Sequence, residues 1–261
     1  MKSLLLAACC VTLAACSPMR EPAVKPLTTA MDEAAMQAGE LRIAASALAA
    51  GDMNVAISLY ERITSSRPEI VSGWLGLANA YYLAGDLSQS RRAYEAVLQR
   101  DPQQIEAGLG LARLDIRLRQ LPQAIERYNA ILQRQPDHPL ALAGLGVAYD
   151  LSGNAQMAQE TYRRGLKTHP DDPALRSNLG LSLSLSGKPR EAVNVLLDVT
   201  GVPSSIPQGK QNLALAYAMM GRDDAAETIL MGEMPRAYVQ DNMAFYKEVR
   251  QRLATAAGAK K

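Results

Sequence analysis

Residues 71–102 read VSGWLGLANAYYLAGDLSQSRRAYEAVLQRDP. Two runs of small, apolar and aromatic residues lie on either side of Gly85 and Asp86, and Pro102 follows the second run. A glycine ends a helix readily because it adopts a left-handed backbone conformation without a side-chain clash, whereas proline cannot continue a helix. Asp86 can cap the helix that comes next. The stretch therefore predicts two helices joined by a tight turn.

The same residue types recur every 34 positions on both sides of this stretch. Prolines stand at Pro68, Pro102, Pro136 and Pro170. The turn glycine recurs at Gly51, Gly85, Gly153, Gly187 and Gly221, with Arg119 in the one gap. Small residues form two columns, Ala44, Ala78, Ala112, Gly146, Gly180, Ala214 and Ala56, Ser90, Ala124, Ala158, Ala192, Ala226. A bulky column reads Tyr60, Tyr94, Tyr128, Tyr162, Leu196 and Leu230. Six repeats, from near Gln37 to near Tyr238, keep one register without a gap.

This pattern resembles the tetratricopeptide repeat, a helix pair of 34 residues. The positions that carry the resemblance are Trp74, Leu77, Ala78 in place of Gly, Tyr81, Ser90 in place of Ala, Tyr94 and Pro102. One helix pair cannot bury its apolar face alone, so neighbouring pairs stack. The fold class predicted is all-α, a tetratricopeptide-repeat superhelix of about six helix pairs with a C-terminal capping helix. A generic bundle rich in Ala and Leu is the alternative, and six columns in one register argue against it.

The period also predicts where each helix begins and ends. The expected helices are Ala30–Ala50, Met53–Ser66, Glu69–Ala84, Leu87–Gln99, Gln103–Leu118, Leu121–Arg134, His138–Leu151, Ala155–Lys167, Pro173–Leu185, Lys188–Val199, Gln208–Met220, Arg222–Met231 and the capping helix Arg236–Ala254. Residues 201–207 hold two prolines and predict a longer loop. The expected organisation is therefore six repeats over residues 30–235, then a capping helix and tail over residues 236–261.

The N-terminus resembles a bacterial lipoprotein precursor. A short positive start and the apolar run Leu4–Thr12 precede Leu13-Ala14-Ala15-Cys16, which is similar to a lipobox. The resemblance implies a lipoprotein signal peptide at residues 1–15, lipidation of Cys16 and a flexible, proline-containing tether over residues 16–29. Ser17 is not the Asp of the inner-membrane retention signal, so the resemblance implies an outer-membrane lipoprotein facing the periplasm. Cys9 also ends a four-residue match but leaves too short an apolar run before it, and an ordinary secretory leader is a further alternative.

Composition argues against several classes of function. The chain has 28 Lys and Arg against 26 Asp and Glu, with no concentrated basic tract, so nucleic acid is not an expected partner. All three cysteines lie at the N-terminus, which excludes a disulfide scaffold. The two histidines, His138 and His169, stand beside repeat-ending prolines and are interpreted as turn residues. No catalytic motif is present, so we expect no catalytic residue, metal site, cofactor or small-molecule substrate.

The expected functional surface is the concave groove, which the first helix of each pair lines in tetratricopeptide proteins. Carried over column by column, the groove residues are Leu75, Asn79, Tyr82, Leu109, Arg113, Ile116, Arg117, Ala143, Val147, Asp150, Ser177 and Leu181. Arg113 and Arg117 lie one helical turn apart and could meet an acidic or C-terminal peptide. Some relatives grip a carboxylate with a clamp of two Lys, two Asn and one Arg. Asn79 occupies one clamp column, but Leu41 or Leu75 replaces the first Lys, so the clamp is incomplete.

The sixth repeat narrows the resemblance. It reads Gln-Asn-Leu-Ala-Leu-Ala at residues 211–216, then Gly221-Arg222, Ala226-Glu227 and Pro235. Behind a lipobox, this layout resembles the TadD-type lipoproteins of Flp (tight adherence) pilus assembly. The resemblance implies a non-catalytic scaffold with a pilotin-like role on the outer-membrane secretin or another pilus-assembly component. A six-repeat pilotin of type IV pili and an adaptor for peptidoglycan enzymes are the alternatives. Arg236–Ala254 is interpreted as a cap, with a partner-binding helix as its alternative.

Overall fold

The computed structural model describes residues 30–200 and 207–258. The chain divides into two compact units, Met1–Gly39 and Glu40–Lys261, and all helices after the first belong to the second unit. The predicted signal peptide, the lipidated Cys16, the tether, most of the 201–207 loop and the last residues of the tail lie outside the described residues.

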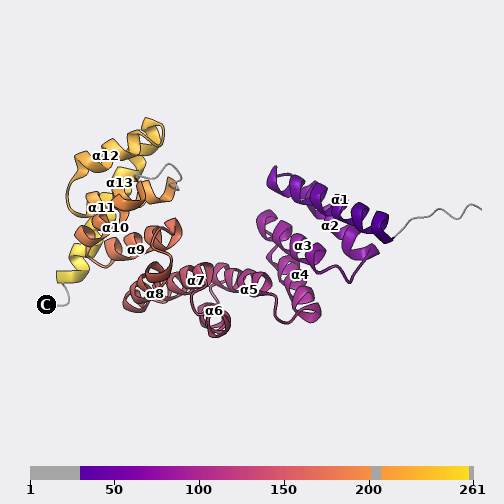
Figure 1. Ribbon diagram of the computed structural model, residues 1–261. Helices are drawn as coiled ribbons and strands as arrows, with labels where there is room; N and C mark the ends of the chain where they lie inside the picture. The colour runs from indigo at the N-terminus through magenta and orange to yellow at the C-terminus, as the bar shows by residue number, and fades with distance from the viewer. Residues whose placement is uncertain (1–29, 201–206, 259–261) are drawn as a thin grey trace, which may run out of the picture. The chain divides into compact units, whose positions relative to one another are not determined.

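The described part of the chain contains thirteen helices and no strand, as Figure 1 shows. They are α1 Ala30–Ala49, α2 Met53–Ser66, α3 Val71–Ala84, α4 Leu87–Arg100, α5 Ile105–Arg117, α6 Leu121–Arg134, α7 Pro139–Leu151, α8 Ala155–Thr168, α9 Pro173–Leu185, α10 Pro189–Thr200, α11 Pro207–Met219, α12 Asp223–Met231 and α13 Arg236–Gly258. The all-α prediction is confirmed, and most boundaries agree within two residues.

The largest differences at helix starts have a common cause. Glu69 and Gln103 were predicted as the first residues of helices, but α3 begins at Val71 and α5 at Ile105. The residues after each repeat-ending proline form a turn, in which the Ile70 amide donates to the Arg67 carbonyl at 3.2 Å. Ile70 is then extended, with φ −75° and ψ 99°, which delays the helix by two residues. The helix α13 runs four residues beyond its predicted end at Ala254.

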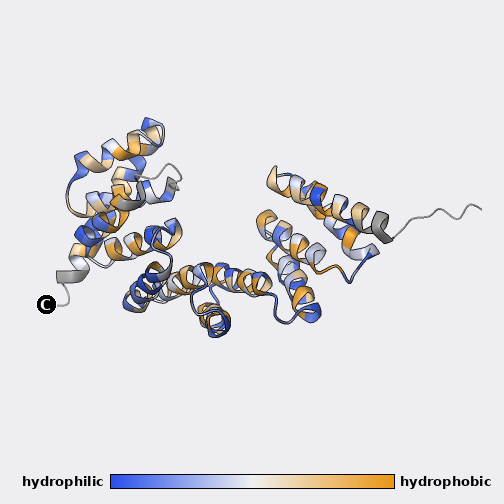
Figure 2. Cartoon of the chain, in the orientation of Figure 1, coloured by the Kyte–Doolittle hydropathy of each residue, from blue (hydrophilic) through white to orange (hydrophobic). Residues whose placement is uncertain are grey.

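Helices of the second unit pack in chain order. Each second helix lies against the first helix of its own pair and that of the next pair, and successive first helices α3, α5, α7, α9 and α11 also contact one another. The first helices therefore form one layer and the second helices another. Apolar residues lie along the packed side of most helices, which Figure 2 shows as orange stripes between blue ones.

The repeat columns make these contacts. Every residue of the two small columns and the bulky column is buried, from Ala44 to Leu230. Tyr94 of α4 lies over Gly110 of α5, where a Cβ atom would stand 2.2 Å from the tyrosine Cζ. Tyr60 and Tyr128 lie over Gly76 and Gly144 of the following repeat in the same way. These tyrosines join one repeat to the next.

The turn column has the backbone that its glycines predict. Gly51, Gly85, Gly153, Gly187 and Gly221 have φ between 76° and 86°. Arg119, which fills the gap in the column, also has a positive φ of 59°, and no other non-glycine among the described residues does. After the turn, the carboxylates of Asp52 and Asp86 accept the Val55 and Gln89 amides, so both cap the next helix as predicted.

The C-terminal helix α13 covers the end of the stack. Val239, Met243 and Tyr246 are buried against α11 and α12, in a cluster that includes Leu215 and Leu230. Arg250 donates to the Ala218 carbonyl at 2.6 Å and to the Asp223 carboxylate at 2.7 Å. These contacts confirm the predicted capping helix. Among the described residues, no helix combines the length and the apolar character that a membrane span requires.

Candidate functional site

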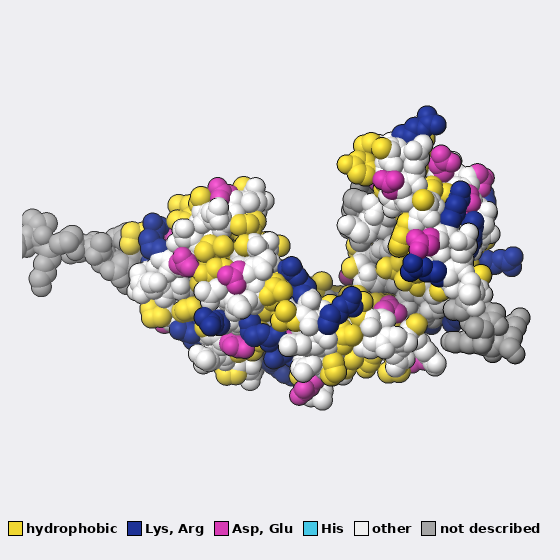
Figure 3. Space-filling model, turned by 180° about the vertical axis from the view of Figure 1, so that it is seen from behind, with side chains coloured by type: hydrophobic (Ala, Val, Ile, Leu, Met, Phe, Trp, Pro, Cys, Tyr) yellow, Lys and Arg dark blue, Asp and Glu magenta, His cyan; other side chains and the backbone are white. Residues whose placement is uncertain are grey.

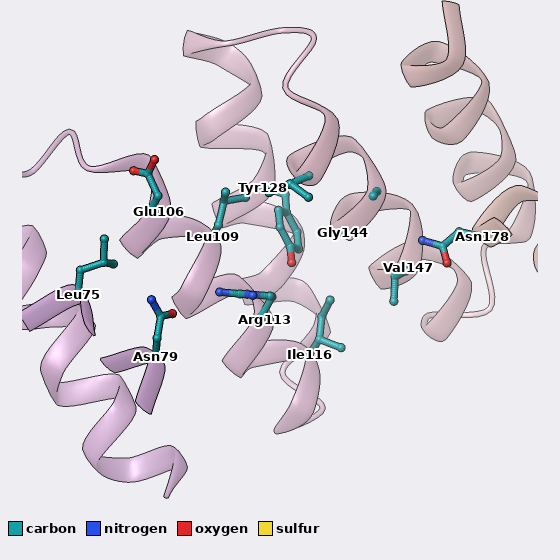
Figure 4. A pocket seen from close by; sticks show the side chains of 12 residues that line it. Leu75, Asn79, Glu106, Leu109, Arg113, Ile116, Tyr128, Gly144, Val147 and Asn178 are labelled. Atoms are coloured by element: carbon teal, nitrogen blue, oxygen red, sulfur yellow. The ribbon is translucent and has the colours of Figure 1, made fainter. Parts of the chain in front are cut away.

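A pocket of about 380 Å³ opens on the layer of first helices. Leu75 and Asn79 come from α3, Leu109, Arg113 and Ile116 from α5, and Figure 4 shows them around one recess. The rest of the lining is Glu106, Tyr128, Leu140, Ala143, Gly144, Val147 and Asn178. Most of these side chains are apolar, as is typical of binding pockets.

A second pocket of about 300 Å³ continues the first one along α7 and α9. Val147 and Asn178 line both pockets, so the two form a continuous groove. Asp150, Leu151, Leu181 and Leu185 also line the second pocket. Because Leu151 and Leu185 are more than 40% exposed, this part of the groove presents apolar surface to solvent.

The structure brings most of the predicted groove residues together. Leu75, Asn79, Leu109, Arg113, Ile116, Ala143 and Val147 line the first pocket, and Asp150 and Leu181 line the second. Tyr82 and Arg117 lie beside the first pocket without lining it. Ser177 was predicted one position away from the correct one: it is buried and accepts from the Asn212 side-chain amide at 2.9 Å. The next residue, Asn178, lines the groove instead.

Two arginines at the edge of the first pocket share one aromatic ring. The guanidinium carbons of Arg113 and Arg117 lie 5.4 and 5.0 Å from the centre of the Tyr82 ring, and Arg117 also donates to the Tyr82 carbonyl at 3.2 Å. Both distances are within cation–π range. Neither arginine forms an ion pair with a carboxylate of the described residues. The ring therefore orients two uncompensated positive charges at the pocket.

Tyr128 is a pocket residue that the sequence reasoning missed, because the bulky column assigned it to the core alone. The residue is 1% exposed, yet its ring end lines the pocket, beside Arg113 in Figure 4. Burial raises the pKa of Tyr128 to about 12, and nearby Arg113 opposes that rise. The hydroxyl is therefore protonated near neutral pH and can donate a hydrogen bond. The missed signal was Gly144, because a glycine under the ring lets it reach the groove.

Asn178 marks a change in the repeat. It stands 34 residues after Gly144, in the column that holds Gly76 and Gly110. An asparagine leaves no room for a ring at this position, and Tyr162 lies instead over Gly146 of its own repeat. Its hydroxyl donates to Asp150 at 3.0 Å, and the Ser182 hydroxyl donates to the same carboxylate at 2.7 Å. Burial raises the pKa of Asp150, although both hydrogen bonds oppose the rise.

The histidines and carboxylates have structural positions. His138 caps α7 by accepting the Ala141 amide, and His169 lies 2.8 Å from the Asp137 carbonyl, so both are turn residues. Asp172 caps α9 by accepting the Leu175 amide at 2.8 Å. In the described residues, no group of three His, Cys, Asp or Glu side chains is placed to hold a metal ion. On the face in Figure 3, charges of both signs are interspersed with apolar side chains.

The comparisons with known proteins agree with this architecture. Family models described as tetratricopeptide repeat match residues 41–105, 82–146 and 119–181, which together span more than half of the chain. No curated protein sequence matches the chain.

Three solved structures illustrate the fold. The crystal structure of PilW, a widely conserved type IV pilus biogenesis factor, is 18% identical over 84% of this chain and 98% of its own, with a TM-score of 0.66. PilF of Pseudomonas aeruginosa is 13% identical over 77% of this chain and 90% of its own, with a TM-score of 0.63. A chain of the Cut9–Hcn1 hetero-tetramer of the APC/C is 22% identical over 84% of this chain and 42% of its own, with a TM-score of 0.64. At these identities the likeness concerns the fold alone. On its repeat columns, its paired helices and the family matches, the chain belongs to the tetratricopeptide-repeat family.

Proposed function

We propose that this protein is a lipid-anchored, non-catalytic scaffold of pilus assembly that binds a protein partner in the groove of its first helices. The observation that carries the proposal is the continuous apolar groove along α3, α5, α7 and α9, with Arg113 at one end and Asp150 further along. Tetratricopeptide grooves bind peptides or helices, and this groove has the size and composition for such a ligand.

Two observations support pilus assembly as the setting. The sixth repeat, residues 211–235, resembles the TadD-type lipoproteins of Flp pilus systems. PilW and PilF, which share the fold over most of the chain, are named for pili. On this proposal the partner is the outer-membrane secretin or another assembly component, and the protein has a pilotin-like role.

The membrane anchor is the second part of the proposal. Cleavage before Cys16 and acylation of its thiol would tie the repeats to the outer membrane on the periplasmic side. Two or three acyl chains give stable anchoring, whereas a single chain is marginal. Replacing Cys16 with Ser should abolish incorporation of labelled palmitate and release the protein from the membrane fraction. Undiminished labelling of the variant would contradict the assignment of Cys16.

A deletion strain tests the function. Loss of the gene should reduce secretin multimers and surface pili, and the wild-type gene should restore both. Arg113→Glu combined with Arg117→Glu should fold normally, since both side chains are exposed, but should restore neither. Exposed Arg92→Glu on α4 is the matched control and should restore both. Normal secretin assembly and piliation without the gene would rule out the proposed function.

A pilotin of type IV pili is the second candidate, because the structures of PilW and PilF extend over most of this chain. Neighbouring genes separate the candidates. A Flp prepilin and its assembly ATPases beside this gene favour the first, and type IV pilus genes favour the second.

A further inference from the structure

The first pocket contains hydrogen-bond donors that lack an acceptor. In the tyrosine column, the Tyr94 hydroxyl donates to Asn79 at 2.6 Å and the Tyr162 hydroxyl donates to Asp150 at 3.0 Å. The residue 34 positions after Asn79 is Arg113, which offers donors only. The Tyr128 hydroxyl accordingly has no hydrogen-bonded acceptor among the described residues, although its side chain is 99% buried and lines the pocket. A buried donor without a partner is costly unless a ligand supplies the acceptor.

The charge at this end of the pocket has the same complement. Arg113 lines the pocket and Arg117 follows one turn later, and no described carboxylate pairs with either. The acidic lining residue Glu106 is seven residues before Arg113 on α5, about 10 Å away along the helix axis. A negatively charged acceptor is therefore favoured beside Tyr128 and Arg113 and disfavoured at the opposite end.

The remaining lining is apolar. Leu75, Leu109, Ile116, Leu140 and Val147 surround a space of about 380 Å³. A ligand that satisfies the whole pocket needs an apolar group close to a carboxylate. The last residue of a polypeptide is the only residue of a protein that carries an apolar side chain and a carboxylate on the same carbon atom. An internal Asp or Glu instead has its carboxylate at the far end of the side chain.

We propose that the pocket between α3, α5 and α7 binds the C-terminal end of its partner, with the terminal carboxylate on Tyr128 and Arg113 and an apolar last side chain against Leu109 and Val147. This inference rests on the proposed function only in taking the ligand to be a protein. It specifies which part of the partner is recognised. It also gives the bound chain a direction, because the segment before the last residue leads away from Arg113 along the groove.

Two peptide pools test the inference on the full chain. Both contain acetylated hexapeptides randomised at the last two positions, and one pool ends in free carboxylates while the other ends in amides. The protein should retain the free-acid pool about tenfold more than the amide pool, because a hydrogen bond to a charged group is stronger than one to a neutral group. Leu, Ile, Val and Met should be enriched at the last position. Equal retention of the two pools, or retention of neither, would overturn the inference.

Variants locate the site. Tyr128→Phe keeps the ring over Gly144 and removes only the hydroxyl, and Arg113→Gln removes the charge. Each should lower retention of the free-acid pool several-fold and leave the thermal melting curve close to that of the wild type. Tyr60→Phe, in the same column on α2 but outside the pocket, should change neither. Unchanged retention by both pocket variants would place the bound carboxylate elsewhere and contradict the proposal.

The two proposals can fail separately. If the free-acid pool binds at Tyr128 and Arg113 but the deletion strain has normal pili, then the inference holds and the pilus function is wrong. If the deletion strain lacks pili but the pools bind equally, then the scaffold function stands and recognition of a C-terminus is wrong.

Discussion

Tyr94 and Gly110 show what a single position contributes to the stack. The tyrosine is fully buried, its hydroxyl donates to Asn79, and the glycine leaves the space in which the ring lies. The ring cannot swing aside without losing that hydrogen bond. The repeat contact therefore depends on the absence of one methyl group.

Gly110→Ala should destabilise the protein. Alanine favours a helix by about 1 kcal/mol over glycine, but its Cβ would stand 2.2 Å from the Tyr94 ring. Overpacking of this kind costs about 1–3 kcal/mol or more, so a net loss is expected in a denaturant titration followed by circular dichroism. Gly108→Ala on the same helix is the control. Its Cβ would meet the end of the flexible Ile131 side chain at 3.4 Å, and the variant should be as stable as the wild type or more so. Equal effects of the two substitutions would contradict this packing.

Asp150 should make stability depend on pH in the direction opposite to an ion-paired carboxylate. Burial raises its pKa above the ordinary 3.8, so the folded state holds its proton more tightly than the unfolded state does. Its contribution to stability therefore falls as the pH rises above 3.8 through the raised pKa. Asp150→Asn should remove that fall and gain stability relative to the wild type as the pH rises. Melting temperatures of both proteins across that range check this, and a constant difference between them would show that Asp150 is not the cause.

At the residue scale, the sequence predicted the core better than the groove. The columns identified the buried residues because packing repeats with the backbone. Ser177 was misassigned because column counting alone does not tell which of two adjacent side chains a helix turns inward. Tyr128 was missed because a buried ring can end at a surface, and only the atoms around its hydroxyl reveal this. The Gly76, Gly110 and Gly144 column was visible in the sequence and would have pointed to it.

Individual helices were predictable from local chemistry. Proline and glycine fix where most of them end, and Asp or His caps several of their starts. The exceptions lie after the repeat-ending prolines, where a turn replaces the first two residues expected in α3 and α5. The 34-residue period gives no information on such a turn, because the turn depends on hydrogen bonds between backbone groups.

Three consecutive helices are joined by one buried carboxylate that the sequence did not reveal. Asp115 of α5 is 1% exposed, and its two oxygens lie 2.8 Å from Arg91 of α4 and 2.8 Å from Arg127 of α6. A buried charge requires such partners, because an unpaired one is strongly destabilising. The three residues are 24 and 12 positions apart in pairs, so no repeat column contains them.

A double-mutant cycle measures this network. Arg91→Met or Arg127→Met alone leaves Asp115 with one arginine and should cost on the order of 1 kcal/mol. Both together leave a buried carboxylate unpaired and should cost about 3–5 kcal/mol, more than the two single losses combined. The exposed pair Arg163 and Glu191, 3.5 Å apart, is the comparison, and Arg163→Met should cost less than about 1 kcal/mol. Strict additivity in urea titrations would mean that the two arginines act independently.

At the scale of the whole chain, contacts join neighbouring helices only. The buried apolar residues form three clusters, from α1 to α5, from α5 to α11, and from α11 to α13. In such an array stability is roughly a sum over repeats and their interfaces. Damage at one end is therefore expected to stay at that end.

Arg250→Met tests this locality. The change removes the hydrogen bonds from α13 to the Ala218 carbonyl and to Asp223, whose pKa is lowered by Arg250. This pair stabilises the cap above the ordinary pKa of Asp223 and the effect is lost as the pH falls, so the variant should differ least from the wild type in acid. Hydrogen exchange near neutral pH should speed up in α11–α13 and remain unchanged in α3–α5. Faster exchange throughout the chain would contradict a nearest-neighbour array.

The groove as a whole was predictable because the first helices of a tetratricopeptide stack face one another. Its ligand was not, because specificity depends on a few donors and charges whose directions come from tertiary packing. Arg113 and Asn79 were identified by their columns, but the missing acceptor for Tyr128 emerges only once the side chains are in place.

The change of tyrosine packing at Asn178 limits how this array can change its length. Before that position, one helix pair can be duplicated or lost in a step of 34 residues, because each tyrosine meets a glycine in whichever repeat follows. Across it, the same step would bring a ring of the earlier kind against Asn178, or leave Gly146 without Tyr162. Gene duplications within this family of repeats should therefore accumulate on the N-terminal side of that boundary, and engineered extensions of the array should be inserted there.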